Sequence, residues 1–332
     1  MNVEKRRVSY VDIGKGIGIF LVVLGHTYRR NIVQNWLYSF HMPLFFFISG
    51  WLYWGGIDKK DYVKFITKKA RGLLLPYAVF LILNFLYWLA VERHFRSFDQ
   101  GPLWYLPVLL VIECVVAAVV IWIGNRKWLF NVCMVAFGMG LICIGLLDGV
   151  FEYKGVIGWI IRCYNGIFWY YAGFWLARHI KQWIEATPNR KNSWILIVVL
   201  LTLSIISGCS NGRVDMYGNL FNNIFLYIFA AFAGIFLCME LSVFLGKNRV
   251  LEYFGKNSLI ILCTHEPIKR AVIQVGSMLL KTPAETIRNN ILIGAVIAMI
   301  VALIEVVAIE ILRFLSRSTN GKKIHFLFEY IK

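Results

Sequence analysis

Ten apolar stretches follow one another along the chain, separated by short polar segments. An α-helix needs about 20 mostly apolar residues to cross a bilayer. The pattern therefore predicts an all-α, polytopic membrane protein with about ten transmembrane helices. The predicted spans are residues 13–30, 36–54, 73–91, 103–123, 128–147, 156–177, 193–208, 219–244, 258–280 and 290–312.

Two of these spans are irregular, and one of them points to a cavity. The seventh is short, and the ninth contains THEPIKR, in which Pro267 predicts a break in the helix. Interrupted helices are tolerated in membranes mainly where they line a cavity. His265 and Glu266 are therefore candidates for residues that line one.

The polar segments differ in charge between the two sides of the predicted membrane. Most of the 35 lysines and arginines fall on the side of the N-terminus, in segments such as DKKDYVKFITKKARG and GKNRVLEYFGKN. The opposite segments, such as DGVFEYKG and GCSNGRVDMYGN, are nearly free of them. Basic segments stay in the cytoplasm, so both termini are predicted to be cytoplasmic. With no repeat or linker, residues 1–332 are predicted to form one membrane domain.

Composition supports the membrane interpretation and excludes other classes. The chain is 59% hydrophobic and 16% charged, with a mean hydropathy of +0.66. Its net charge of +17 is explained by the cytoplasmic segments, so no nucleic-acid partner is expected. The seven cysteines include no C-x-x-C pair, which argues against a disulfide framework or a zinc site. The basic start is interpreted as the flank of a retained first helix and not as a cleaved signal.

The first span, KGIGIFLVVLGH, carries a lysine at one end and a histidine at the other. Lys15 and His26 are eleven residues apart, which places them on one helical face with a rise of ~16 Å. Asp12 can pair with Lys15 at the cytoplasmic end. Ionisable residues inside a membrane are candidates for function. The alternatives are that Lys15 snorkels to the surface and that His26 is a hydrogen-bonded packing residue.

His41, in FHMPLFFFISGWLY, is the second candidate in the membrane. The first two spans are joined by a short turn, so His26 and His41 are expected to face each other in the outer half. Two histidines could bind a metal, but no nearby carboxylate or cysteine is apparent to complete the ligands, so no metal is expected. The alternative for His41 is a hydrogen bond between helices. Gly14, Gly18 and Gly25 form a stripe that would let a neighbouring helix approach closely.

These motifs resemble acyltransferase family 3, the integral-membrane O-acyltransferases of bacterial surface sugars, and in particular its fucose 4-O-acetylase-like branch. The family's first-helix motif, a basic residue followed after ten residues by histidine, is matched by Lys15 and His26. Three weaker motifs are also similar: TKKARGLLLPY with Arg71, LWYL with Trp104 and Tyr105, and H-x-P-I at His265.

The resemblance implies a membrane O-acyltransferase in the bacterial cytoplasmic membrane. Such an enzyme moves an acyl group, commonly acetyl, from cytoplasmic acyl-CoA, a cosubstrate and not a bound cofactor, to a hydroxyl of a surface or lipid-linked glycan. Histidine titrates near neutrality, which suits removal of the hydroxyl proton. His26 is the expected base, with His41 as second catalytic candidate. The other expected roles are acyl-donor binding by Asp12, Lys15 and Arg71, and acceptor-side or cavity positions for Trp104, Tyr105, His265 and Glu266.

A secondary transporter or flippase that exports a glycan or an organic anion is the alternative. It would also explain a charged path and a broken helix. The sequence shows no pair of interrupted helices in corresponding halves, which transporter repeats tend to have. The enzyme is therefore the favoured interpretation. The sequence does not predict the oligomeric state, the sugar or the acyl group.

Overall fold

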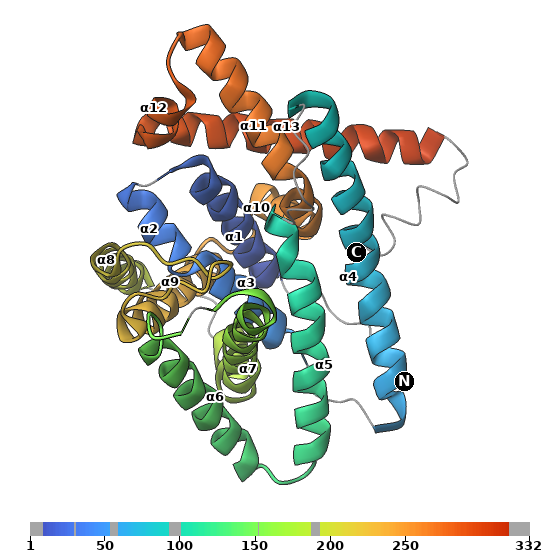
Figure 1. Cartoon of the computed structure of the whole chain (residues 1–332). Coiled ribbons are helices and arrows are strands. Elements are labelled where there is room, and N and C mark those ends of the chain that lie inside the picture. The colour runs from blue at the N-terminus through green and yellow to red at the C-terminus, as the bar shows by residue number, and fades with distance from the viewer. Residues whose placement is uncertain are drawn as a thin grey trace.

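The computed structural model describes residues 9–29, 31–53, 59–92, 101–151, 153–186 and 193–318. The described part is helical, with two isolated β-bridges and no named strand (Figure 1). Each of the ten predicted spans contains a helix, and seven helical segments are long and apolar enough to cross a membrane. An all-α polytopic membrane protein is thereby confirmed, whereas the count of ten and the cytoplasmic termini stay predictions.

The helices follow one another along the whole described chain. The α-helices are α1 Ser9–Thr27, α2 Ile32–Tyr38, α3 His41–Trp51, α4 Tyr62–Tyr87, α5 Tyr105–Ile123, α6 Trp128–Leu146, α7 Gly155–Ala186, α8 Ser193–Asn211, α9 Ile224–Phe244, α10 Arg249–Lys256, α11 Ser258–Leu280, α12 Ala284–Asn289 and α13 Ile291–Ser318. Three further turns are the 3₁₀ segments η1 Lys59–Asp61 and η3 Gly101–Trp104 and the π-helical segment η2 Trp88–Glu92.

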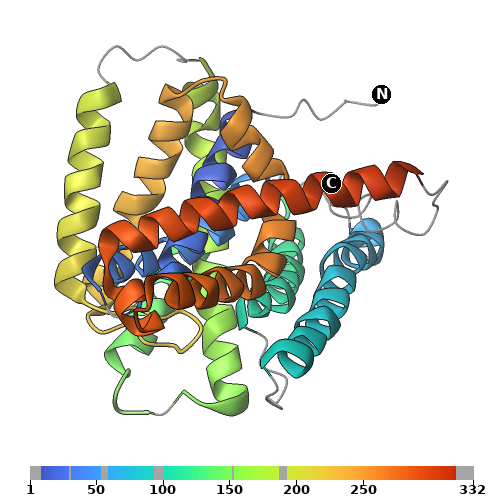
Figure 2. The ribbon, with the colours of Figure 1, turned by 90° about the horizontal axis from the view of Figure 1, so that it is seen from above.

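Helix α1 lies at the centre of the bundle (Figure 1). It packs against α2, α3, α9, α10, α11 and α13, and 61% of its apolar window is buried. In the peripheral segment Lys59–Ala90 only 11% of the apolar window is buried, so most of its apolar side chains are exposed to lipid. Helix α13 crosses the molecule from one side to the other (Figure 2). The histidine-bearing helix is thus fixed from several directions.

Glycines let α10 cross the first half of α1 at close range. A Cβ atom at Gly16 would collide with the backbone carbonyl of Leu251, and one at Gly255 would collide with the carbonyl of Asp12. The predicted stripe also contacts neighbours, since a Cβ at Gly18 would lie 3.0 Å from Leu44. Among the glycines of α1, the tightest approach is nevertheless at Gly16, which lies outside that stripe. Small residues at such crossings allow backbones to meet.

The second predicted span is broken into two helices. Helix α2 begins at the cap residue Asn31, whose Oδ1 accepts the amide of Gln34 at 2.8 Å. It ends because Ser39 donates its hydroxyl to the carbonyl of Trp36 at 2.6 Å, a local bond that competes with the helix. Phe40 then takes φ −138° and ψ −20°, and α3 starts at His41. The break lies directly beside a candidate catalytic residue.

The predicted break at Pro267 is wrong. Helix α11 runs without interruption from Ser258 to Leu280, with Pro267 inside it. Backbone groups freed by a proline in a membrane helix can be satisfied by side chains and neighbouring helices. In the turn before Pro267, Thr264 also bonds the carboxylate of Glu305 on α13, at 2.9 and 2.8 Å. The packing of α11 on α13 therefore supports a continuous helix.

Candidate active site

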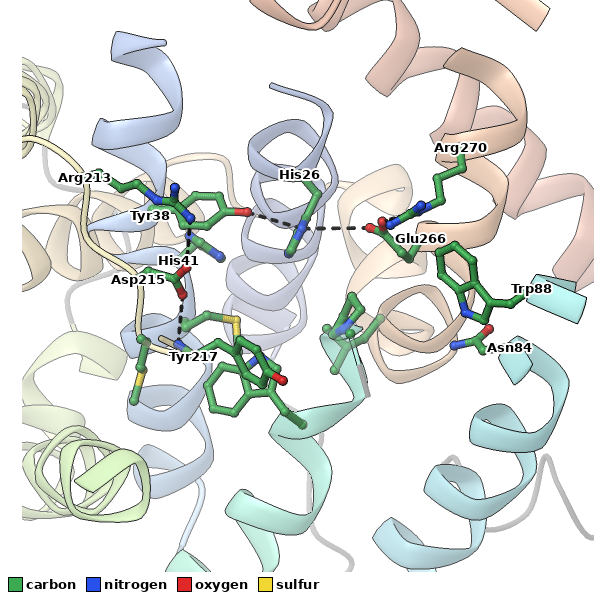
Figure 3. Close-up of a pocket in the computed structure, with 16 residues that line it drawn as sticks. His26, Tyr38, His41, Asn84, Trp88, Arg213, Asp215, Tyr217, Glu266 and Arg270 are labelled. Atoms are coloured by element: carbon green, nitrogen blue, oxygen red, sulfur yellow. Dashed lines mark hydrogen bonds and ion pairs between the residues drawn. The ribbon is translucent and has the colours of Figure 1, made fainter. Parts of the chain in front are cut away.

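A cavity of about 250 Å³ lies at the C-terminal end of α1, where several helices and loops converge (Figure 3). Histidines, aromatic residues and charged residues line it together. The lining residues are His26, Tyr38, His41, Met42, Asn84, Trp88, Gly101, Pro102, Trp104, Arg213, Asp215, Met216, Tyr217, Leu262, Glu266 and Arg270. Four of the nine residues proposed from the sequence are among them: His26, His41, Trp104 and Glu266.

His26 has two polar neighbours at one ring nitrogen. Its Nδ1 lies 3.3 Å from the hydroxyl of Tyr38 and 4.0 Å from Oε2 of Glu266, from opposite sides of the ring (Figure 3). The partner of Nδ1 determines which nitrogen of an imidazole carries the proton. The hydroxyl of Tyr38 can either donate to Nδ1 or accept from it, whereas the negative charge of Glu266 favours a proton on Nδ1, which leaves Nε2 as the basic nitrogen. Glu266 is thus placed to orient the imidazole of His26, as the carboxylate does in a catalytic triad.

Glu266 is held by two cations of its own helix. Oε2 accepts from Nζ of Lys269 at 2.7 Å, and Oε1 accepts from Nε of Arg270 at 2.8 Å. These residues follow Glu266 at positions i+3 and i+4, which face the same side of a helix. Lys269 is 3% exposed, so its charge requires this carboxylate. The carboxylate beside His26 thus remains in one position.

Two cations also hold the backbone at the end of α1. Nζ of Lys269 donates to the carbonyl of His26 at 3.2 Å. Arg288, on α12, donates to the carbonyls of His26 and Thr27 at 3.2 Å and of Tyr28 at 3.4 Å. The last carbonyls of a helix lack partners within it and favour positive charge. Burial lowers the pKa of Arg288, but an arginine remains charged.

The other two histidines have defined tautomers. Nδ1 of His41 lies 2.6 Å from the carbonyl of Leu37, and Nδ1 of His265 lies 2.8 Å from that of Ile261. A carbonyl only accepts hydrogen bonds, so each Nδ1 carries a proton, and each Nε2 is the free base in the neutral ring. His41 lines the cavity, with its ring centroid 6.3 Å from that of His26. His265 is fully buried behind His26, with ring centroids 5.2 Å apart.

A metal site was not expected, because no carboxylate seemed to lie near the histidines. That reason is wrong, since potential ligand atoms of His26, His265 and Glu266 lie within 4.8 Å of one another. Nε2 of His265 has no hydrogen-bond partner among the described residues. Glu266, however, already neutralises Lys269 and contacts Arg270. A metal ion bound to Glu266 would have to displace Lys269 and Arg270 or lie close to their positive charges. The charges of the site therefore disfavour a metal.

A second polar cluster lies nearer the other end of α1. Nζ of Lys69 donates to Oε1 of Glu113 at 2.5 Å, and Lys15 also acts electrostatically on this carboxylate. Glu113 is 4% exposed. Arg71, the residue proposed for donor binding, is exposed on α4, and it is Lys69 of the same segment that reaches the cluster. Asp12 is buried at the start of α1.

The expectation for Tyr105 is corrected. Tyr105 does not line the cavity: it is buried against Phe46, with ring centroids 4.8 Å apart, whereas the adjacent Trp104 reaches the cavity. Arg162, on α7, donates to the backbone carbonyl of Tyr217 at 2.5 Å and stacks on that ring.

The sequence missed several residues of the site. Lys269 and Arg270 could have been found, because they follow Glu266 at helical spacing within THEPIKR. Arg288 carries no such signal, since only tertiary structure brings it to α1. The missed residues are Tyr38, Trp88, Arg213, Asp215, Tyr217, Lys269, Arg270 and Arg288.

Comparison with known proteins identifies the family of the chain. Residues 8–310 match a family model described as an acyltransferase domain. Two similar proteins are both described as nodulation protein NolL. The one from Mesorhizobium japonicum is 26% identical over 199 residues, which cover 51% of this chain and 52% of the relative. The one from Sinorhizobium fredii is 38% identical over 103 residues, 28% of each chain. The chain thus spans about half or less of the curated relatives it matches, and no solved structure matches significantly.

Proposed function

Because the chain belongs to the acyltransferase family 3 that its residues 8–310 match, we propose that it transfers an acyl group from cytoplasmic acyl-CoA to a hydroxyl of a cell-surface or lipid-linked glycan. Membership in this family makes the chain a membrane acyltransferase and argues against the transporter. The donor, the glycan acceptor, acetyl as the acyl group and the bacterial cytoplasmic membrane are parts of the proposal.

The position of His26 carries the proposal. Its ring lies in the wall of the cavity, with Nδ1 toward Tyr38 and Glu266. Nε2 accepts the proton of the acceptor hydroxyl as its oxygen attacks the thioester carbonyl carbon. The carbon–sulfur bond then breaks, coenzyme A leaves as a thiolate, and the proton on Nε2 returns to that sulfur or to water. A positioned base of this kind contributes roughly 10²–10⁴ in rate.

Glu266 and Tyr38 support this role from behind the ring. A carboxylate near Nδ1 favours the tautomer that presents a basic Nε2, and it stabilises the imidazolium that forms. Lys269 keeps the carboxylate in place and binds the backbone of His26 at the same time. The surrounding helices restrict access of water, which would otherwise hydrolyse the thioester.

The donor is proposed to enter at the cytoplasmic end of α1. Lys15 lies near the start of α1, and Lys69 and Arg71 lie on α4; such cations suit the phosphates of coenzyme A. Lys15 precedes His26 by eleven residues, a rise of ~16 Å along the helix. An extended acyl-bearing arm between the two ends would bring the thioester to the cavity.

The test is release of free coenzyme A by the protein purified in lipid nanodiscs. Acetyl-CoA is supplied with a panel of methyl glycosides, and both the thiol and the acetylated sugar are measured. We expect thiol release that depends on a glycoside and matches the acetylated product in amount. Glycoside movement across liposomes without release of the thiol would contradict the proposal and favour the transporter.

A further inference from the structure

The loop between α8 and α9 forms one wall of the cavity and has a defined structure. Oδ1 of Asp215 accepts the amides of Tyr217 at 3.0 Å and Gly218 at 3.1 Å, and Oδ2 pairs with Arg213 at 3.1 Å. Backbone hydrogen bonds between Asp215 and Leu220 close the turn. The loop belongs to the segment GCSNGRVDMYGN, which the charge pattern predicts to lie outside. It is therefore on the side from which a glycan would arrive.

Arg162, on α7, joins two aromatic residues of this wall. Its guanidinium carbon lies 4.3 Å from the ring centroid of Tyr217 and 5.6 Å from that of Trp104. The guanidinium also donates to the carbonyl of Tyr217 at 2.5 Å. The two rings are 6.0 Å apart between centroids. Cation–π contacts and this hydrogen bond together hold Tyr217 beside Trp104.

Both arginines that line the cavity are already held by carboxylates. Arg213 pairs with Asp215, and Arg270 shares Glu266 with the buried Lys269. The guanidinium of Arg270 also covers the ring of Trp88 at 4.1 Å from its centroid. A negatively charged ligand would compete with a carboxylate for each arginine. The lining therefore fits a neutral ligand that has an apolar face and several hydroxyls.

We propose that Trp104, Tyr217 and Asp215 form the acceptor subsite, which binds one neutral sugar ring with a hydroxyl directed toward His26. This inference rests on the proposed function. The aromatic faces contact the C–H groups of the ring, and Asp215 accepts a hydrogen bond from a hydroxyl. Arg162 is a positioning residue for the aromatic pair. The volume of about 250 Å³ is below the ~300–1,000 Å³ of pockets for larger ligands, which suits a single ring.

Matched probes test the preference for a neutral ring. Methyl glucoside and methyl glucuronide differ only at C6, where the uronate has a carboxylate in place of the hydroxymethyl group, and methyl galactoside and methyl galacturonide differ in the same way. With acetyl-CoA saturating, we expect the better neutral glycoside to have at least a tenfold higher kcat/KM than its uronate. Equal or better use of the uronates would overturn the proposal.

Variants test the residues of the subsite. We expect Tyr217→Leu and Asp215→Asn to raise the KM for the glycoside at least tenfold and to leave the KM for acetyl-CoA unchanged. Asp215→Asn keeps Oδ1 as the acceptor for the turn, so its loop should remain folded. Arg162→Lys should raise the glycoside KM with little change in kcat. Trp194→Ala, at an exposed position away from the cavity, is the control. Unchanged glycoside KM values in folded variants would refute the subsite.

A binding measurement separates failure of the subsite from failure of the proposed function. The variant His26→Gln is expected to bind glycosides without turnover, seen as protection against thermal unfolding. Protection that Tyr217→Leu abolishes in this background would support the subsite, even if the unaltered protein released no coenzyme A. Turnover that is insensitive to Tyr217 and Asp215 would leave the proposed function intact and refute the subsite.

Discussion

Lys269 donates from Nζ to the backbone carbonyl of His26 at 3.2 Å, across 243 positions of sequence. The same ammonium contacts Oε2 of Glu266 at 2.7 Å. One buried cation therefore links the main chain of His26 to the carboxylate that faces its ring. Preorganised groups of this kind hold a reacting atom in place without rearrangement during the reaction.

Replacing His26 by glutamine should nearly abolish acyl transfer. Glutamine keeps much of the size and some hydrogen bonding but cannot accept a proton. We expect kcat to fall by roughly 10²–10⁴-fold, with normal membrane insertion and thermal midpoint. His41→Gln is the matched control and should lose less activity. Near-normal turnover by folded His26→Gln would mean that His41 or His265 is the base.

Replacing Glu266 by glutamine should lower kcat by up to ~10⁴-fold, the loss seen when the carboxylate of a serine-protease triad becomes an amide. This change also leaves Lys269 buried without its carboxylate, which destabilises by about 3–5 kcal/mol. The double variant Glu266→Gln/Lys269→Met removes both charges and should regain thermal stability but not turnover. If it regained turnover, the role of Glu266 would be limited to neutralising Lys269.

Replacing Arg288 by alanine should loosen the end of α1. Hydrogen bonds from a charged group contribute about 1.5–3 kcal/mol each, and three carbonyls would lose this donor. We expect a lower thermal midpoint and a lower kcat, with Arg288→Lys intermediate because an ammonium does not span the three carbonyls. Lys247→Ala, at an exposed position, is the control. An unchanged midpoint and kcat in Arg288→Ala would contradict this role.

Replacing Gly16 by valine should destabilise the crossing of α1 and α10. The new Cβ would meet the carbonyl of Leu251, a backbone group that cannot rotate away. Overpacking of this kind costs about 1–3 kcal/mol. Gly276→Ala is the matched control, because it lies within α11 with open space around it. Gly276→Ala should stabilise the protein by about 0.5–1 kcal/mol. A higher thermal midpoint for Gly16→Val than for Gly276→Ala would refute the packing argument.

Glu252, on α10, should make stability depend on pH. Hydrogen bonds from Ser9 and then Lys256 lower the pKa of this carboxyl below its ordinary value. A lowered pKa adds stability above the unfolded value of about 4.3, and this stability is lost as the pH falls through the folded value. Glu252→Gln should therefore lower the thermal midpoint slightly at pH 7 and not at acid pH. The effect is small because the pair is partly exposed. A difference that persisted in acid would contradict this assignment.

The sequence predicted what depends on local periodicity. Hydropathy located the ten helical segments, and helical spacing placed Lys15 and His26 on one face. Both follow from regular geometry within a single helix. The proline rule failed at Pro267, because the packing of α11 on α13 outweighed the local tendency. The break at Ser39 was missed because it depends on one side-chain hydrogen bond in an apolar segment.

The site itself depends on contacts between distant segments. The spacing around His26 does not indicate that Glu266 faces it or that Arg288 reaches its carbonyl. Nothing in the sequence around Gly16 indicates that α10 crosses α1 at this residue. The periodicity of one helix predicts the face on which a residue lies, but it does not predict which residues of other helices contact that face.

The attachment of Arg288 to the end of α1 has a consequence for biosynthesis. His26 belongs to α1, whereas Arg288 follows 262 positions later. At about 5–20 residues per second, roughly 13–50 s separate their synthesis. During that interval the histidine is already on the chain without the cation that secures its backbone. We therefore expect acyl-transfer competence only after α12 has been made, and a nascent chain that stops before α12 should carry every histidine of the cavity and still be inactive.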